Sequence, residues 1–242
     1  MTARLDKALT EAGLVGSRQR AQALVMAGSV RVNGETERRP DRMVRTEDLL
    51  ELDAGEGWAS RGALKLLPVL EKLGVEVEGR VCADIGASTG GFTDVLLRRG
   101  AARVFAVDVG RGLIDWRLRQ DPRVTLLERT NARSLESFAE PVGLVLIDVS
   151  FIGLETVLPA IRRSAPGAEV LALFKPQFQV GREQVGKGGI VRDREAVTAA
   201  RARFEDWCHR SGYEVAGHAL AGVPGTDGNQ EHFYQLEPIP IP

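Results

Sequence analysis

The chain has 242 residues, of which 43% are hydrophobic and 27% charged, and its net charge is −1. This composition is typical of a soluble globular protein and excludes the disordered, fibrous and disulfide-scaffold classes. No apolar run approaches the roughly 18 residues of a membrane-spanning helix, and charged residues interrupt the N-terminal stretch where a secretory signal would be apolar. Two cysteines, Cys82 and Cys208, cannot make a disulfide framework or a four-cysteine zinc site. We expect a protein of the reducing cytoplasm that does not enter a membrane.

Positive charge is concentrated in the N-terminal part of the chain. Residues 1–45 contain nine Lys and Arg but only five Asp and Glu, whereas residues 61–242 contain 23 of each kind. A basic segment beside a neutral remainder fits a nucleic-acid-binding module, but it also fits a solvated helical face. Charge alone leaves both interpretations open.

The first elements in chain order are predicted to be two helices and a hairpin. Apolar residues at helical spacing predict one helix that ends at Gly13 and a second that Ser17 caps and Gly28 ends. Alternation over residues 29–33 predicts a strand, and Asn33-Gly34 is a strong signal for a hairpin turn. Residues 49–52 are predicted to close this module as a further strand.

The segment SRQRAQALVMAGSVRVNG, residues 17–34, resembles the S-four-type RNA-binding domain. The resemblance implies a small α+β domain with its linker over residues 1–57, and it implies that the family's basic RNA contacts correspond to Arg4, Arg18, Arg20 and Arg31. Guanidinium groups suit this role because they bind phosphate through two parallel hydrogen bonds, and folded RNA is recognised largely by shape and backbone. A generic two-helix cap with exposed arginines is the alternative.

Beyond Trp58 the pattern changes to strands that alternate with helices. The predicted strands are residues 80–85, 103–108, 124–128, 144–148, 170–175, 215–221 and 231–237, and the predicted helices are residues 93–99, 153–164 and 193–210. Such alternation predicts an α/β fold with a mostly parallel sheet covered by helices on both faces. The last two strands are joined by residues 222–230 without a helix, so the last strand should be antiparallel. We therefore expect a Rossmann-like, seven-stranded sheet.

The richest local motif is DIGASTGG, which follows the first strand of this sheet. Its glycines let the backbone approach a ligand closely, but the spacing is neither GxGxxG nor that of a phosphate loop. Asp108 ends the next strand, where a carboxylate can accept hydrogen bonds from two vicinal ribose hydroxyls. The motif resembles motif I of S-adenosylmethionine-dependent methyltransferases. That resemblance implies a cofactor site formed by Asp84, Gly86, Ser88, Gly90, Gly91, Phe92, Asp108, Asn131 and Asp148.

A second set of charged residues is dispersed in sequence: Lys65, Asp148, Lys175 and Glu231. Three of them stand at predicted strand ends, and strand ends at one edge of a doubly wound sheet converge. Lys175 follows the apolar run LALF, where a buried lysine needs a partner. Two structural ion pairs would also explain the set. The four residues match the Lys-Asp-Lys-Glu tetrad of FtsJ-like ribose 2′-O-methyltransferases, which implies that they are catalytic, with Lys175 as the general base.

Nearly the whole chain resembles the TlyA family of ribosomal RNA cytidine 2′-O-methyltransferases, whose members are also called haemolysins. The segments that carry this resemblance include WASRGALKL, DIGASTGGFTD, DVSFI, KPQF and VGKGGIVRD. It implies a methyltransferase domain over residues 58–242, S-adenosyl-L-methionine as cofactor, and ribosomal RNA or a ribosomal subunit as partner, with no metal and no obligate protein partner. Two departures are Pro68, at which we expect the helix after Lys65 to begin, and the unusual loop before Glu231. A haemolysin and a non-catalytic RNA-binding or assembly factor are the alternatives.

Overall fold

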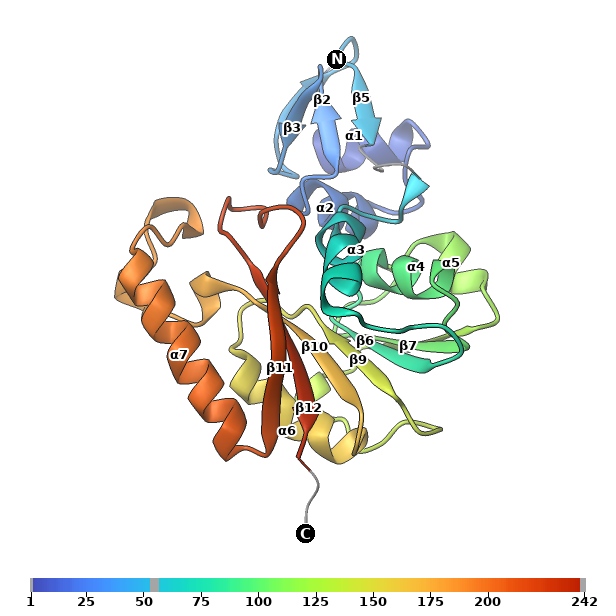
Figure 1. Ribbon diagram of the computed structural model, residues 1–242. Helices are drawn as coiled ribbons and strands as arrows, with labels where there is room; N and C mark the ends of the chain where they lie inside the picture. The colour runs from blue at the N-terminus through green and yellow to red at the C-terminus, as the bar shows by residue number, and fades with distance from the viewer. Residues whose placement is uncertain (1, 53–56, 240–242) are drawn as a thin grey trace.

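The computed structural model describes residues 2–52 and 57–239, which form a small N-terminal unit above a larger C-terminal unit (Figure 1). The predicted boundary near residues 55–58 falls partly outside the described residues. The N-terminal unit consists of β1 (Thr2–Arg4), α1 (Leu5–Glu11), α2 (Arg18–Met26), β2 (Val30–Val32), β3 (Glu35–Glu37), β4 (Met43–Arg45) and β5 (Leu50–Leu52). Strands β3, β2 and β5 form one sheet and β1 pairs with β4. Its apolar core is separate from the two cores of the C-terminal unit.

Local chemistry explains the N-terminal elements that the sequence predicts. The Ser17 hydroxyl accepts a hydrogen bond from the backbone N–H of Arg20, which confirms the predicted N-cap of α2. Asn33 and Gly34 both have positive φ, as a tight hairpin turn requires, and β2 pairs with β3 across them. The short strands β1, β3 and β4 are additional to the strands we predicted, because three residues are too few to show a clear alternation.

The C-terminal unit contains a seven-stranded sheet in the order β11-β12-β10-β9-β6-β7-β8. Its elements are α3 (Gly62–Leu73), β6 (Val81–Ile85), α4 (Gly91–Arg98), β7 (Arg103–Asp108), α5 (Trp116–Gln120), β8 (Val124–Glu128), β9 (Leu144–Ile147), α6 (Leu154–Ser164), β10 (Glu169–Phe174), α7 (Arg194–Arg210), β11 (Tyr213–Leu220) and β12 (His232–Pro238), with 3₁₀ turns at Ala132–Ser134, Pro176–Phe178, Arg182–Gln184 and Lys187–Gly189. Strand β12 is antiparallel to both neighbours, while the pairs of β6–β10 are parallel. The predicted fold class is confirmed.

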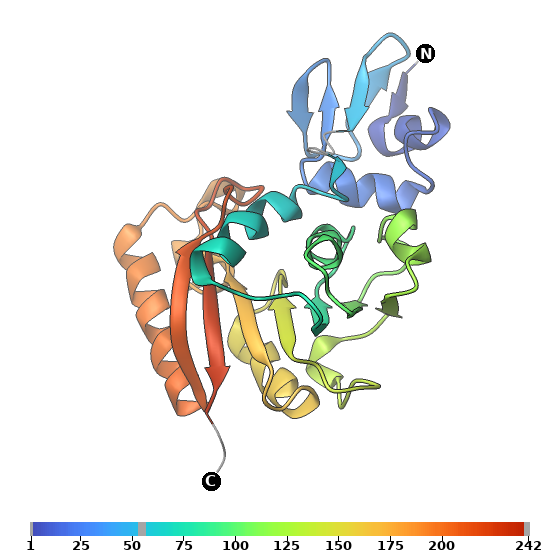
Figure 2. The same ribbon diagram turned by 45° about the vertical axis from the view of Figure 1, so that its right-hand side comes forward.

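The sheet separates two apolar cores, because successive strand residues point to opposite faces. Residues of α3, α4 and α5 pack on one face and residues of α6 and α7 on the other, as Figures 1 and 2 show. Strand β6 alternates accordingly, with Cys82 in the first core and Ala83 and Ile85 in the second. The carboxyl ends of β6, β7, β9 and β10 therefore meet at one edge, and the N-terminal unit sits over the α3–α5 side of that edge (Figure 2).

Helix α3 begins at Gly62 and contains Pro68 in its interior, so our prediction of a helix starting at Pro68 is wrong. Proline has no N–H, so it cannot donate to the carbonyl of Leu64, four residues earlier. The loop after β11 packs at this point: Gly222 donates its N–H to the Lys65 carbonyl at 3.0 Å, and a Cβ on Gly222 would collide with the Leu64 carbonyl oxygen. The proline is thus accommodated by a contact that ties the helix carrying Lys65 to the loop that leads to Glu231.

Candidate active site

The glycine-rich turn between β6 and α4 is bound tightly to the neighbouring strand ends. Gly86 donates its N–H to the Val107 carbonyl at 2.8 Å, and its φ is +87°. A Cβ at Gly86 would collide with the Asp148 carbonyl, and one at Gly90, where φ is +94°, would collide with the Leu118 side chain. These positions require glycine, since both the space and the positive φ exclude an ordinary side chain.

Asp108 holds this turn from the end of β7. Its carboxylate accepts the Ser88 N–H at 2.8 Å and the Gly110 N–H at 2.7 Å. Each carboxylate oxygen has two acceptor positions, so two remain for a ligand. Asn131, predicted as a cofactor residue, uses its side chain to cap the following 3₁₀ turn by accepting from the N–H of Arg133. It lies at the end of β8 and does not line the cavity described below.

Asp84 is buried at the end of β6 with only one of its carboxylate oxygens satisfied. Oδ2 accepts from the backbone N–H and the hydroxyl of Thr93, at 2.9 and 2.7 Å. Oδ1 is buried and has no hydrogen-bond partner among the described residues. Burial raises the pKa of Asp84 to about 7. An unsatisfied buried carboxylate oxygen is costly, which points to a ligand that donates a hydrogen bond or positive charge here.

The four dispersed charged residues form two adjacent ion pairs. Lys175 Nζ lies 2.5 Å from Asp148 Oδ1 and donates to the Ser150 hydroxyl at 3.0 Å. Lys65 Nζ lies 2.7 Å from Glu231 Oε2, whose side chain is 2% exposed. The elements that position them are the ends of β9 and β10, helix α3, and the residue just before β12. The sheet edge therefore brings all four predicted residues together.

The two pairs also act on each other electrostatically. Burial disfavours the charge of Lys65, but the carboxylates of Asp148 and Glu231 outweigh it and raise the lysine's pKa. Burial raises the pKa of Glu231. Burial also acts to raise the pKa of Asp148, yet Lys175 and Lys65 together lower it below its ordinary value. Lys65 is therefore held as an ammonium group, and Asp148 as a carboxylate.

One cavity joins the glycine-rich turn to one member of each ion pair, Lys65 and Asp148. It is lined by predicted site residues from both sets, namely Lys65, Asp84, Gly86, Ser88, Gly91, Phe92 and Asp148. The predicted residues of these two sets outside its lining are Gly90, Asp108, Asn131, Lys175 and Glu231. Sequence reasoning missed the rest of the lining, which comprises Ala27, Ser60, Arg61, Gly62, Ala87, Thr89, Val223, Pro224 and Thr226. Ser60–Gly62 lie within the segment SRGALKL that contains Lys65, which was a usable signal. The contribution of Ala27 depends on how the two units pack and has no local signal.

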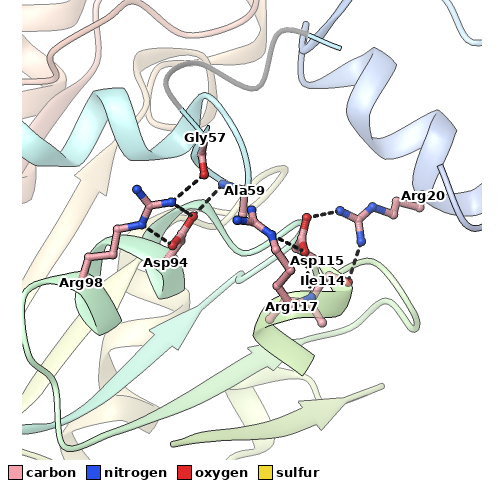
Figure 3. Close-up of polar contacts among 8 residues, drawn as sticks. All are labelled: Arg20, Gly57, Ala59, Asp94, Arg98, Ile114, Asp115 and Arg117. Carbon is pink, nitrogen blue, oxygen red and sulfur yellow. Dashed lines mark hydrogen bonds and ion pairs between the residues drawn. The ribbon is translucent and has the colours of Figure 1, made fainter. Parts of the chain in front are cut away.

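The arginines predicted to bind RNA differ in their surroundings. Arg31 is exposed on β2. Arg4 and Arg18 are about half exposed but pair with the buried Asp6, at 3.1 and 3.0 Å. Arg20 does not fit the predicted phosphate contact: its side chain is 14% exposed and binds Asp115 of the C-terminal unit (Figure 3).

Comparisons with known proteins agree with the two-unit architecture. Residues 58–237 match the FtsJ-like methyltransferase family and residues 3–50 match the S4 domain. The chain is 46% identical to the 16S/23S rRNA (cytidine-2′-O)-methyltransferase TlyA of Mycobacterium tuberculosis, over 97% of this chain and 89% of the relative. It is 36% identical to Hemolysin A of Brachyspira hyodysenteriae, over 95% and 98% of the two chains.

A solved structure supports the same relationship. A Streptococcus thermophilus protein described as a candidate hemolysin superposes with a TM-score of 0.77 at 39% identity, covering 100% of this chain and 90% of that one. Because the family match covers most of the chain and relatives align over nearly its full length, the chain belongs to the FtsJ-like methyltransferase family, among the TlyA proteins that combine an S4 domain with a methyltransferase domain.

Proposed function

We propose that this protein transfers a methyl group from S-adenosylmethionine to the 2′-hydroxyl of a cytidine ribose in ribosomal RNA. The observation that carries the proposal is a cavity that joins the glycine-rich turn to Lys65 and Asp148, each of which is ion-paired to a further charged residue. Relatives named as rRNA cytidine-2′-O-methyltransferases support the choice of substrate. A ribosomal substrate also supports a cytoplasmic location for the enzyme.

The residues of the turn fit S-adenosylmethionine. The buried and unsatisfied Asp84 Oδ1 suits the positive charge and N–H groups of the cofactor's methionine part. Asp108 has acceptor positions for ribose hydroxyls, and the crowding at Gly86 and Gly90 keeps the backbone close enough to shape the site. When bound, the cofactor supplies a methyl group already activated by a sulfonium.

The tetrad would orient the ribose and accept its proton. Lys65, held as an ammonium group by Glu231 and Asp148, suits the orientation of a hydroxyl oxygen. Lys175 is the better candidate for the base, because Asp148 and Ser150 fix its Nζ at the end of β10. Its neutral form would take the 2′-hydroxyl proton while the oxygen forms its bond to the methyl carbon. Holding both groups in line supplies much of the rate.

Lys175 substitutions test this assignment. Lys175→Ala should lower the single-turnover rate of methyl transfer by about 10² to 10⁴, the usual contribution of a general base, while cofactor affinity stays unchanged. Lys175→Arg should be nearly as inactive, since arginine keeps the charge but does not deprotonate at ordinary pH. Lys72→Ala, at the end of α3 outside the cavity, is the matched control. Near-normal rates for the arginine variant would leave Lys175 as an electrostatic anchor and refute its role as base.

The S4 domain would supply the RNA contacts. We assign residues 1–57 to this domain and its linker, and residues 58–242 to the methyltransferase domain, because the two units have separate apolar cores. Arg4, Arg18 and Arg31 are the exposed or half-exposed basic groups proposed to contact phosphate.

Two other functions have their own tests. A non-catalytic RNA-binding factor would transfer no label from radiolabelled S-adenosylmethionine to ribosomal RNA, so the wild-type protein decides that alternative. The similarity to Hemolysin A makes lysis of cells an alternative function, and a haemolysis assay with purified protein and red cells would test it. Within residues 2–52 and 57–239, no helix combines the length and apolar character needed to cross a membrane.

A further inference from the structure

Arg20 makes a largely buried ion pair between the two domains. From α2 of the S4 domain, its Nη2 lies 2.5 Å from Asp115 Oδ2 and its Nη1 donates to the Ile114 carbonyl at 3.1 Å (Figure 3). The two side chains are only 14% and 12% exposed. A buried ion pair is favourable only when its geometry is good and additional hydrogen bonds satisfy the remaining polar atoms of both side chains. The Arg20 fork and the second Asp115 oxygen, which accepts from the Arg117 N–H, meet that requirement.

The neighbouring arginine on α2 shows that this arrangement is specific. Arg18 pairs with Asp6 inside the S4 domain and is 55% exposed. Arg20, two residues later, points to the methyltransferase domain instead. The end of the same helix also reaches the partner domain, because Ala27 lines the cofactor cavity and a Cβ on Gly28 would lie 2.9 Å from Arg61 Nη1.

Asp115 belongs to the segment that packs directly on the glycine-rich turn. Its backbone N–H donates to the Thr89 carbonyl at 3.1 Å. The nearby Ile114 and Leu118 side chains cover Gly90, because a Cβ at Gly90 would collide with atoms of both. A contact with Asp115 therefore places the S4 domain relative to the site of methyl transfer, rather than to a remote surface.

The segment before α3 provides the first attachment between the domains, at the end of the linker. Ala59 donates its N–H to Asp94 Oδ2 at 2.8 Å, and Arg98 donates to the Gly57 carbonyl at 2.5 Å (Figure 3). The Arg98 guanidinium also lies 4.0 Å from the centre of the Trp58 ring. One attached end leaves a domain free to rotate, whereas two separated attachments define its orientation. Arg20 and Asp115 supply the second point.

We propose that Arg20 and Asp115 form an interdomain lock that fixes the distance and direction from the RNA-binding surface to the catalytic cavity. This inference rests on the proposed function. RNA bound by a locked S4 domain has its target ribose held near Lys175, whereas RNA on a loosely tethered domain reaches the cavity only part of the time. Arg20 and Asp115 are thus positioning residues that contact neither RNA nor cofactor.

Matched neutral variants test the lock from both sides. Arg20→Gln and Asp115→Asn remove one charge each, and asparagine retains the N-cap of α5. Both should lower the single-turnover rate on folded ribosomal RNA by roughly ten- to a hundredfold, with unchanged affinity for RNA and for S-adenosylhomocysteine. The double variant should be no slower than either single one, because both break the same interaction. Arg45→Gln, which removes the same charge from an exposed position of the S4 domain, should keep the wild-type rate at saturating RNA.

A phosphate contact at Arg20 predicts the opposite pattern. Arg20→Gln would then weaken RNA binding and flatten its salt dependence, and Asp115→Asn would leave the rate normal. Either result would overturn the lock.

A distance measurement separates this inference from the proposed function. Spin labels on Glu35→Cys and Glu195→Cys, both exposed, would report the distance between the domains, while the native Cys82 and Cys208 are buried. We expect a narrow distance distribution that broadens with Arg20→Gln and Asp115→Asn but not with Arg18→Gln. An equally narrow distribution in all variants would refute the lock. If the wild-type protein methylated no RNA, the proposed function would fail while the distance result still stood.

Discussion

Asp84 couples the stability of the protein to pH. Its pKa of about 7 in the folded state, raised by burial, exceeds the roughly 3.9 of an unfolded aspartate. Between these values the folded state binds the proton more tightly, so this residue's contribution to stability is complete below pH 4 and is lost as pH rises through 7. The free energy of unfolding of wild type should therefore fall from pH 5 to pH 8, relative to that of Asp84→Asn, by an amount on the order of a few kcal/mol. Urea unfolding at both pH values measures it, and a pH-independent difference would contradict the assignment.

Asp108 allows a test of the cofactor cradle at the residue scale. Asp108→Ala removes an acceptor for the cofactor's ribose and also releases the N–H groups of Ser88 and Gly110. We expect binding of S-adenosylhomocysteine to weaken by about 1.5 to 3 kcal/mol, the usual value for hydrogen bonds to a charged group. Calorimetry would measure it, with Asp121→Ala, outside the cavity, as the control. Equal affinities for the two variants would mean that Asp108 does not bind the cofactor's ribose.

At the scale of single elements, the turn between β6 and α4 tolerates the least change. Gly86→Ala combines a positive φ with a collision against the Asp148 carbonyl. At Gly74, which ends α3 with φ +65°, a Cβ meets nothing within 4 Å, so Gly74→Ala should cost only about 1 to 2 kcal/mol for the left-handed conformation. Gly86→Ala should cost more and abolish cofactor binding. Urea unfolding and calorimetry on both variants would show whether the turn behaves as a rigid cradle.

The elements differ in how well their sequences predict them. Strands β7, β9 and β10 are apolar runs that end at or beside a charged residue, and β6 is apolar except for Asp84, so their positions and their convergent ends were predictable. The start of α3 was misplaced, because a proline inside a helix is unusual and the contact of Gly222 with this turn comes from a distant part of the chain. Helix α5, with five residues, is too short to show a helical period. Local pattern fails where a contact from another part of the chain decides the structure.

The residues of the candidate site also differ in how well the sequence predicts them. Asp148, Lys175 and Glu231 could be placed together because strand order dictates which ends converge. Lys65 lies on α3 and was added through the resemblance to the FtsJ-like tetrad. Arg20 could not be predicted correctly, since a basic residue on an S4 helix has the same local sequence whether it faces RNA or another domain. Only the packing of α2 against the segment around Asp115 distinguishes the two.

At the scale of the whole molecule, RNA affinity and cofactor affinity should respond to different substitutions. Neutralising Arg4, Arg18 and Arg31 together should weaken RNA binding and reduce the slope of log K against log salt by up to about 3, one for each phosphate contact. Affinity for S-adenosylhomocysteine should not change, because these residues lie outside the cavity. Fluorescence anisotropy at several salt concentrations would measure the slope. An unchanged slope would mean that RNA is bound through another surface.

The position of β12 has a consequence for how the protein is made. Residues 232–238 are synthesised after every other strand of this sheet, yet β12 fills the interior of the sheet, between β10 and β11. Until it is inserted, the nascent chain exposes two strand edges with unpaired N–H and C=O groups, which are sites for aggregation. Glu231, the partner of Lys65, also arrives with it. A polypeptide stopped at Gln230 would therefore be prone to aggregation and unable to form the ion pair of Lys65 with Glu231, so the candidate site is completed only after the last strand of this sheet has been made.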